Sequence, residues 1–205
     1  MNDTVITQQR SGKFLGVIVD DRLSFREHIS YIGGKISKSL GILYNLKSFI
    51  PKAGLINLYY SIVYPHLIYC NLAWGGASAV HLNTLFVLQK RAIRIIHSMQ
   101  YRDHTNGKFL ESEVLKLNDI HKYLLAVYMF TSDSSQYERT HPYLTRNRNM
   151  LNPMFNRLTQ SQRSLFFSAP TVFNTLPDVV RNAPSIGSFK IKLKRFLLGS
   201  YLESV

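Results

Sequence analysis

The stretch His81–Gln100, HLNTLFVLQKRAIRIIHSMQ, decides the fold class. Its apolar residues recur at steps of three and four, the spacing that places side chains on one face of a helix. These residues are Leu82, Leu85, Leu88, Ala92, Ile95 and Ile96. The cationic residues Lys90, Arg91 and Arg94 fall mostly on other faces. One helix is therefore predicted to carry both a core seam and a cationic strip.

Two interpretations of this strip are open from the sequence. The first is a core helix whose solvated side is basic, because charged residues mostly occupy exposed positions. The second is a surface that lies along a phosphate backbone, because lysine and arginine neutralise phosphate charges without reading sequence.

The composition indicates a protein with a core and an acidic partner. The chain has 205 residues, 45% of them hydrophobic, a net charge of +13 and a pI of about 9.9. This balance favours nucleic acid or an anionic surface as the partner. The last third is the more basic part, since ten Lys or Arg and one acid, Asp178, occur between Arg139 and Ser200.

Cys70 is the single cysteine. It excludes a disulfide partner within the chain and a multi-cysteine zinc site, and it favours an intracellular protein, in the nucleus or the cytoplasm. Its neighbours Tyr69 and Leu72 predict burial, which disfavours a nucleophile. The first residues match no signal peptide, and a strand-like segment follows them at once, so we expect the tail of a longer protein.

A membrane span is a competing interpretation of Leu55–Trp74. This stretch has about the length of a span, and no charged residue occurs between Lys52 and Lys90. Polar or helix-breaking residues interrupt it at Asn57, Ser61, Pro65, His66 and Asn71. A buried helix is therefore favoured, and membrane association is the weaker alternative.

Near the N-terminus, Lys13–Val19 is short and β-branched, which predicts a strand or hairpin. The following pair Asp20-Asp21 suits either a turn that leads to a helix capped by Ser24 or a magnesium site. We favour the turn because Glu27 is the one further carboxylate nearby.

Helices follow the hairpin. The periodicity predicts an amphipathic helix over Phe25–Phe49, and Pro51 suits the first turn of a second helix that Pro65 ends or kinks. A last helix is predicted to start at Ser185. Short connections between the first three helices imply an up-and-down bundle.

The fold class expected is mainly α, with a short N-terminal strand or hairpin, a helical bundle and a basic helical C-terminal extension. The expected segments are residues 1–22 for the strand or hairpin, 23–132 for the bundle, 133–153 for a linker or long loop, and 154–205 for the extension.

Known catalytic patterns are missing from the sequence. It has no P-loop, no nucleophile elbow and no His-Glu-x-x-His pair. The seven histidines are scattered and are expected to be packed or solvated residues rather than metal ligands. Trp74 is expected to be a packing anchor, with a base-stacking platform as the alternative. No catalytic residue, metal site or cofactor is predicted.

Several short motifs resemble, in order and spacing, the reverse transcriptases of non-LTR retrotransposons of the LINE or jockey type. The motifs are Phe14-Leu15-Gly16-Val17, Tyr64-Pro65-His66-Leu67, Trp74-Gly75, Leu88-Gln89-Lys90-Arg91-Ala92, Tyr101-Arg102, Ala169-Pro170 and Ser188-Phe189-Lys190. The resemblance covers roughly residues 13–198.

The resemblance implies a role for each segment. Residues 13–22 match the palm's end, where Phe14, Leu15 and Gly16 belong to the hairpin that supports the primer. Residues 25–100 match the thumb, which grips an RNA/DNA duplex independently of its sequence. In this family the metal-binding aspartates lie upstream, so the resemblance implies a fragment that is not an enzyme and whose partners are nucleic acid and the missing palm and fingers.

The residues expected to hold phosphates are Lys35, Lys38, Lys90, Arg91, Arg94, Lys190 and Lys194. The competing hypothesis is a structural or interaction remnant, in which the basic faces are merely solvated and the apolar faces once met the missing palm.

Overall fold

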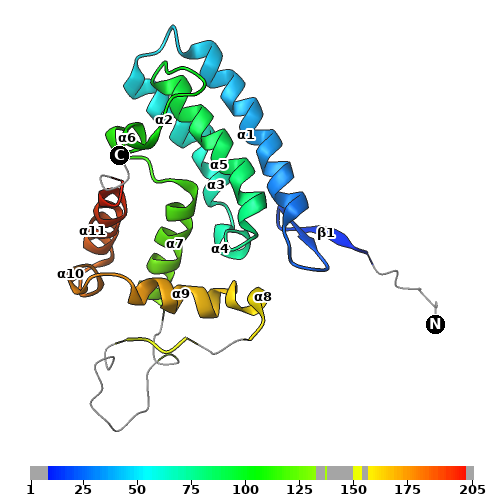
Figure 1. Ribbon diagram of the computed structural model, residues 1–205, viewed down its shortest axis with the longest axis vertical. Helices are drawn as coiled ribbons and strands as arrows, with labels where there is room; N and C mark the ends of the chain where they lie inside the picture. Colours follow the sequence, from blue (N-terminus) through cyan, green and yellow to red (C-terminus); the bar gives the residue numbers. More distant parts are fainter. Residues whose placement is uncertain (1–8, 133–136, 138–149, 154–156, 202–205) are drawn as a thin grey trace.

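The computed structural model describes residues 9–132, 137, 150–153 and 157–201. Most of the expected linker at 133–153 therefore lies outside the described residues. The elements, in chain order, are β1 (Ser11–Phe14), β2 (Val17–Asp20), α1 (Arg26–Leu46), α2 (Lys52–Ile62), α3 (Tyr64–Ile68), α4 (Asn71–Trp74), α5 (Ala79–Ile96), α6 (Asn106–Glu111), α7 (Leu117–Thr131), α8 (Thr159–Gln162), α9 (Leu165–Asn174), α10 (Asp178–Arg181) and α11 (Ile186–Gly199) (Figure 1).

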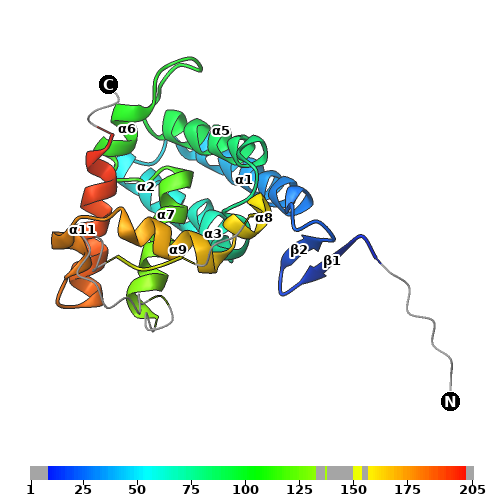
Figure 2. The same ribbon diagram turned by 60° about the horizontal axis from the view of Figure 1, so that its bottom comes forward.

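The N-terminal segment is an antiparallel hairpin. β1 and β2 pair from Ser11 with Asp20 to Phe14 with Val17, which leaves a two-residue turn between them. Both turn residues have positive φ, 45° at Leu15 and 84° at Gly16, as the commonest two-residue hairpin turn requires. The strand predicted over Lys13–Val19 is thus bent back on itself at Leu15-Gly16. Figure 2 shows the hairpin beside the start of α1.

Asp20 shapes the turn between the hairpin and α1. Its carboxylate accepts hydrogen bonds from the backbone amides of Arg22, Ser24 and Phe25 at 2.7–3.1 Å. Burial raises the pKa of Asp20, but these hydrogen bonds outweigh it, and the pKa lies below its usual value. The Ser24 hydroxyl donates to Asp20 and accepts from the Arg26 amide at 3.4 Å. The helix begins at Arg26, one residue later than a Ser24 cap would place it, because Phe25 has a left-handed backbone with a φ of 53°. Among the described residues, no three His, Cys, Asp or Glu side chains gather into a set that could hold a metal ion.

α1 and α5 lie side by side along the bundle (Figures 1 and 2). A Cβ placed on Gly33 of α1 would meet Leu85 and Leu88 of α5 at 3.6 and 3.7 Å. Gly33 therefore faces α5 at ordinary van der Waals distance. The predicted core seam of α5 is confirmed at Leu85, Ala92, Ile95 and Ile96, which are buried, while Leu82 and Leu88 are half-buried.

The apolar stretch Leu55–Trp74 forms three short helices. α2 ends at Ile62, Pro65 lies in the first turn of α3, and Cys70, with a φ of 49°, separates α3 from α4. None of the helices in the described part of the chain combines the length and the apolar character that a membrane crossing requires.

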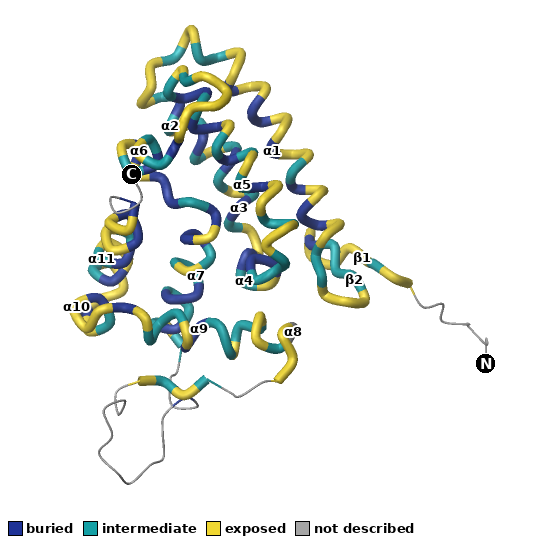
Figure 3. Tube along the Cα trace, in the orientation of Figure 1, coloured by how far each residue is buried: buried dark blue, intermediate teal, exposed yellow. Residues whose placement is uncertain are grey.

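The C-terminal helices share one core with the bundle. α9 and α11 both pack on α7, and the rings of Phe130 and Phe189 stack with centroids 4.2 Å apart. The Tyr201 hydroxyl donates to the Asp119 carboxylate at 2.7 Å and accepts from the Lys116 amide at 2.9 Å. The fold class is as expected, namely mainly α with an N-terminal hairpin, and Figure 3 shows the buried positions running through the bundle and α11.

Candidate nucleic-acid interface

The C-terminal half of α5 and the loop after it form a cationic hollow of about 410 Å³ on the surface. Three of its cations come from α5 and one comes from the loop. We call these four residues the α5 basic surface: Lys90, Arg91, Arg94 and Arg102. The structure thus brings together three of the residues that the sequence predicted as phosphate ligands.

The loop after α5 is held as a closed turn. Arg94 donates from Nε and Nη2 to the backbone carbonyl of Asp103 at 3.2 and 3.0 Å. The Asp103 amide donates to the Gln100 carbonyl at 3.2 Å, and the Gln100 amide donates to the Asp103 carboxylate at 2.8 Å. Tyr101 and Arg102 therefore occupy the two central positions of a β-turn that is fixed to α5.

The opposite side of α5 is fixed by a buried polar residue. Gln89 Nε2 donates to the Tyr59 hydroxyl and to the Leu115 carbonyl, both at 2.9 Å, and Gln89 Oε1 accepts from the Leu117 amide at 2.8 Å. Burial raises the pKa of Tyr59, so its hydroxyl stays neutral. These bonds set the rotation of α5 and turn its cations outward. Sequence reasoning missed Gln89, because an isolated glutamine gives no signal of burial.

No carboxylate pairs with the α5 basic surface within the described ranges. Ion pairs do engage other cations, and they join Lys52 and Lys108 to Glu111, Lys122 to Asp119, Arg181 to Asp178, and Lys194 to Glu113. Within the fold, Arg94 bonds the neutral Asp103 carbonyl and Lys90 Nζ lies 4.8 Å from the centroid of the Phe86 ring. No described carboxylate therefore neutralises the positive charge beside the hollow, whereas charge elsewhere is partly neutralised.

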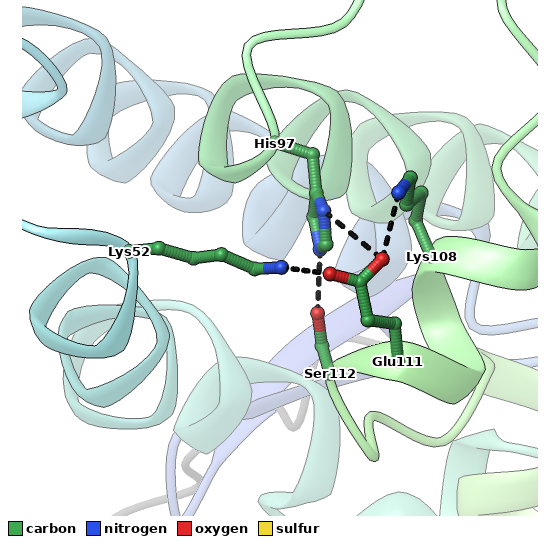
Figure 4. A network of polar contacts seen from close by, with 5 residues as sticks. All are labelled: Lys52, His97, Lys108, Glu111 and Ser112. Carbon is green, nitrogen blue, oxygen red and sulfur yellow. Dashed lines mark hydrogen bonds and ion pairs between the residues drawn. The ribbon is translucent and has the colours of Figure 1, made fainter.

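A network around Glu111 occupies the end of α5 (Figure 4). The Glu111 carboxylate pairs with Lys52 and with Lys108 at 2.7 Å, and Lys108 and Lys52 lower its pKa to about 2. His97 Nε2 and Ser112 Oγ lie 2.6 Å apart, and burial lowers the pKa of His97. This network joins α2, α5 and α6, so these lysines serve the fold.

A second cationic hollow, of about 290 Å³, lies between the hairpin, α1 and α3. Lys35 Nζ and Lys13 Nζ lie 4.6 and 5.3 Å from the centroid of the Tyr31 ring. His28 anchors the hairpin here, because its Nδ1 accepts from the Ile18 amide at 3.3 Å. Burial and the nearby Lys35 lower the pKa of His28.

The tip of the hairpin is exposed on this side. Phe14 and Leu15 are 71% and 74% exposed. The Tyr69 hydroxyl donates to the Leu15 carbonyl at 2.6 Å, and a Cβ on Gly16 would lie 3.4 Å from the Tyr69 ring. The tip is therefore tied to the segment between α3 and α4, with its apolar side chains in solvent.

Lys35 and Lys38 point away from α5. Gly33 faces α5, and Lys35 and Lys38 lie two and five positions further on, about 200° and 140° around the helix. The structure therefore places the predicted cations of α1 and α5 on different surfaces.

α11 lies on the side of the molecule away from the hairpin, so its cations belong to neither hollow (Figure 2). Lys190 is exposed. Lys194 lies 3.6 Å from the Glu113 carboxylate, and Lys192 donates to the Val179 carbonyl at 3.2 Å. The helix begins as predicted, with the Ser185 side chain accepting from the Ser188 amide.

The remaining candidate residues serve packing or are exposed. Trp74 is buried, and its Nε1 donates to the Tyr69 carbonyl at 2.8 Å. His121 Nδ1 lies 2.8 Å from Asn71 Oδ1, and burial lowers its pKa to about 4. The predicted burial of Cys70 is wrong, since its left-handed backbone between α3 and α4 leaves the residue exposed.

Comparison with known proteins places these surfaces in context. No protein-family model and no solved structure matches the chain. It is 26% identical over 166 residues to a probable RNA-directed DNA polymerase from the transposon X-element of Drosophila melanogaster, a match that covers 80% of this chain and 17% of that relative. RNA-directed DNA polymerases from the mobile element jockey are 30% identical in Drosophila funebris and 29% identical in Drosophila melanogaster, each over 122 residues.

The jockey matches cover 58% of this chain and 13% of each relative. The chain thus spans 13–17% of the length of these curated relatives. They correct one expectation. The sequence predicted a fragment that is not an enzyme, but the relatives are named as RNA-directed DNA polymerases, which are enzymes. The predicted resemblance itself is confirmed: the chain is similar to one part of the RNA-directed DNA polymerases of non-LTR retrotransposons of the jockey and X-element type.

Proposed function

We propose that this chain is part of an RNA-directed DNA polymerase and that its α5 basic surface holds the phosphate backbone of the nucleic acid on which the polymerase acts. The similarity to the jockey and X-element polymerases supports the first part. The second part is carried by one observation, the four cations around a hollow that no described carboxylate neutralises.

The chemistry of the surface favours contact with the backbone. Lysine and arginine that neutralise phosphates release condensed counterions, and this gain is the same for every sequence. Such contacts position a protein on nucleic acid without reading bases. A polymerase must move along any template, so a surface of this kind suits a thumb that holds an RNA/DNA duplex.

We propose a separate role for the hairpin, at the end of the primer. Because the hairpin resembles the one that supports the primer in the retrotransposon reverse transcriptases, we assign this role to Phe14, Leu15 and Gly16. Lys35 lies in the hollow beside them. We assign the weaker phosphate contacts to Lys38, Lys190 and Lys194, because they lie outside the α5 hollow and Lys194 already has an acidic partner.

The salt dependence of binding tests the proposal. The variant Lys90→Gln/Arg91→Gln/Arg102→Gln removes three charges and keeps Arg94, which holds the turn. For an RNA/DNA duplex, the logarithm of the binding constant is plotted against the logarithm of the salt concentration. The slope of this plot should become shallower by about 2 to 3 units, because each lost phosphate contact reduces its magnitude by about 0.9.

A matched control is Lys190→Gln/Lys192→Gln/Arg195→Gln, which removes the same charge from α11. Its slope should fall by less than about 1 unit. Equal slopes for the two triple variants, with both still folded by circular dichroism, would reject the α5 basic surface as the binding site.

A further inference from the structure

The α5 hollow contains an aromatic wall and an apolar floor as well as cations. Tyr101 lines it and is 84% exposed, more than most large hydrophobic residues of the described chain. Val87, 46% exposed, and Leu88 line it from α5. A surface that served phosphates alone would need none of these three side chains.

Tyr101 is held in place but its ring is uncovered. The turn Gln100–Asp103 fixes its backbone to Arg94. No ring or cation covers Tyr101 among the contacts of the described residues, whereas lysines lie over the rings of Tyr31 and Tyr44. Both faces of the Tyr101 ring are therefore available for stacking on a ligand.

We infer that the α5 hollow binds single-stranded nucleic acid, with one unpaired base stacked on Tyr101 and the flanking phosphates on Lys90, Arg91 and Arg102. This inference rests on the proposed function and extends it: the cations hold the backbone of a duplex, and an unpaired strand gains the Tyr101 ring in addition.

The chemistry separates a single strand from a duplex. Every base has a flat π-face, and stacking on an exposed aromatic ring is favourable and largely independent of sequence. Within a duplex these faces are covered by neighbouring base pairs except at its two ends, so a duplex binds the hollow mainly through the cations. A single strand can use the cations, the Tyr101 ring and the apolar floor of Val87 and Leu88 together.

Substitution of Tyr101 in the full chain tests the inference. The probes are fluorescent oligo-uridine and oligo-deoxythymidine of about 12 nucleotides and a blunt duplex of the same length, with affinity read from anisotropy. Tyr101→Ala should weaken binding of both single strands by about tenfold or more, and Tyr101→Phe by less than about twofold, because the ring is kept. Duplex affinity should change by less than about twofold for both variants.

The control Phe166→Ala removes another exposed aromatic side chain, on α9, and should leave all affinities unchanged. If Tyr101→Ala affects single strands and duplex equally, or neither, the stacking site is rejected, while the charge variants above still decide the proposed function. Displacement of oligo-uridine by polyglutamate of equal charge at equal concentration would also overturn it, since a mere anion surface needs no base.

Discussion

The two basic helices α5 and α11 carry similar charges and use them differently. On α5, the cations surround a hollow and no described carboxylate pairs with them. On α11, Lys194 lies 3.6 Å from the Glu113 carboxylate, and Lys192 Nζ donates to the Val179 carbonyl. Each helix also has a cation that bonds a carbonyl, Arg94 on α5 and Lys192 on α11. The difference therefore lies in the carboxylates: Glu113 neutralises Lys194 of α11, whereas no described carboxylate neutralises a cation of the α5 basic surface.

What a basic helix can bind is decided by the partner of each cation and not by the number of cations. A paired lysine must give up its carboxylate before it can hold a phosphate. This contrast can be tested on the inner and outer faces of the two helices and on α7, which contacts both of them.

The largest effect is expected from the inner face of α5. Gln89→Leu removes three hydrogen bonds and leaves the Tyr59 hydroxyl, the Leu115 carbonyl and the Leu117 amide without this partner. A buried polar group left unsatisfied costs about 1–3 kcal/mol, so the free energy of unfolding should fall by about 4 kcal/mol. Urea unfolding measures it. Asn83→Leu, on the exposed side of α5, is the control, and a loss below about 1 kcal/mol for Gln89→Leu would contradict the network.

A nearly equal effect is expected from pH through His121 on α7. Its pKa is about 4 in the folded chain, below the value of about 6.5 expected when unfolded. The neutral form is favoured by folding, so His121 stabilises the protein above pH 6.5, and this contribution is lost as the pH falls from 6.5 through 4. The loss should reach about 3 kcal/mol.

His28 and His97 shift the pH dependence in the same direction, because their pKa values are also lowered. His121→Gln should therefore flatten, and not abolish, the fall in unfolding free energy between pH 6.5 and pH 4. A variant whose stability declines with pH as steeply as that of the parent chain would show that His121 is not the main titrating group.

A smaller effect is expected where the C-terminal segment closes on α7. Tyr201→Phe removes the hydroxyl that bridges Asp119 and the Lys116 amide. The free energy of unfolding should fall by about 1–2 kcal/mol, since one bond of the pair has a charged acceptor. The exposed Tyr44→Phe serves as the control. Equal stability of the two variants in urea would mean that this bridge does not hold the C-terminal segment.

The smallest effect is expected from the ion pair on α11. Lys194→Gln breaks the pair with Glu113, whose side chain is 76% exposed. An exposed ion pair contributes little because water and salt screen it, so the unfolding free energy should change by less than about 0.5 kcal/mol. Lys190→Gln is the matched variant on the same helix. A loss above about 1 kcal/mol for Lys194→Gln alone would show that the pair matters more than its exposure suggests.

Local periodicity was enough to predict the long helices α1, α5 and α11, but not the short helices α3 and α4 or the helix α9. Leu85, Ala92 and Ile96 repeat at helical steps and are buried in α5. Ser185 was identifiable as a helix start because its side chain can accept from an amide three residues later, and it does so. The resemblance to retrotransposon polymerases also followed from motif order, and the comparisons confirm it.

The arrangement of the candidate site could not be predicted in the same way. The direction of Lys35 depends on which side of α1 receives α5, and that side is marked by Gly33, which faces Leu85 and Leu88. Arg102 and Tyr101 join the α5 hollow through the bonds of Arg94 and Asp103, which a sequence pattern does not reveal. The motif Tyr101-Arg102 contributed to the resemblance, but the order of the motifs did not predict that these two residues lie beside α5.

Lysine footprinting tests most directly whether α5, and not α11, holds nucleic acid. The full chain is treated with an amine-reactive reagent with and without saturating RNA/DNA duplex, and modification at Lys90 and Lys190 is quantified by mass spectrometry. The account predicts strong protection of Lys90 and at most weak protection of Lys190, which is exposed on α11. Protection of Lys190 with Lys90 still reactive would contradict it.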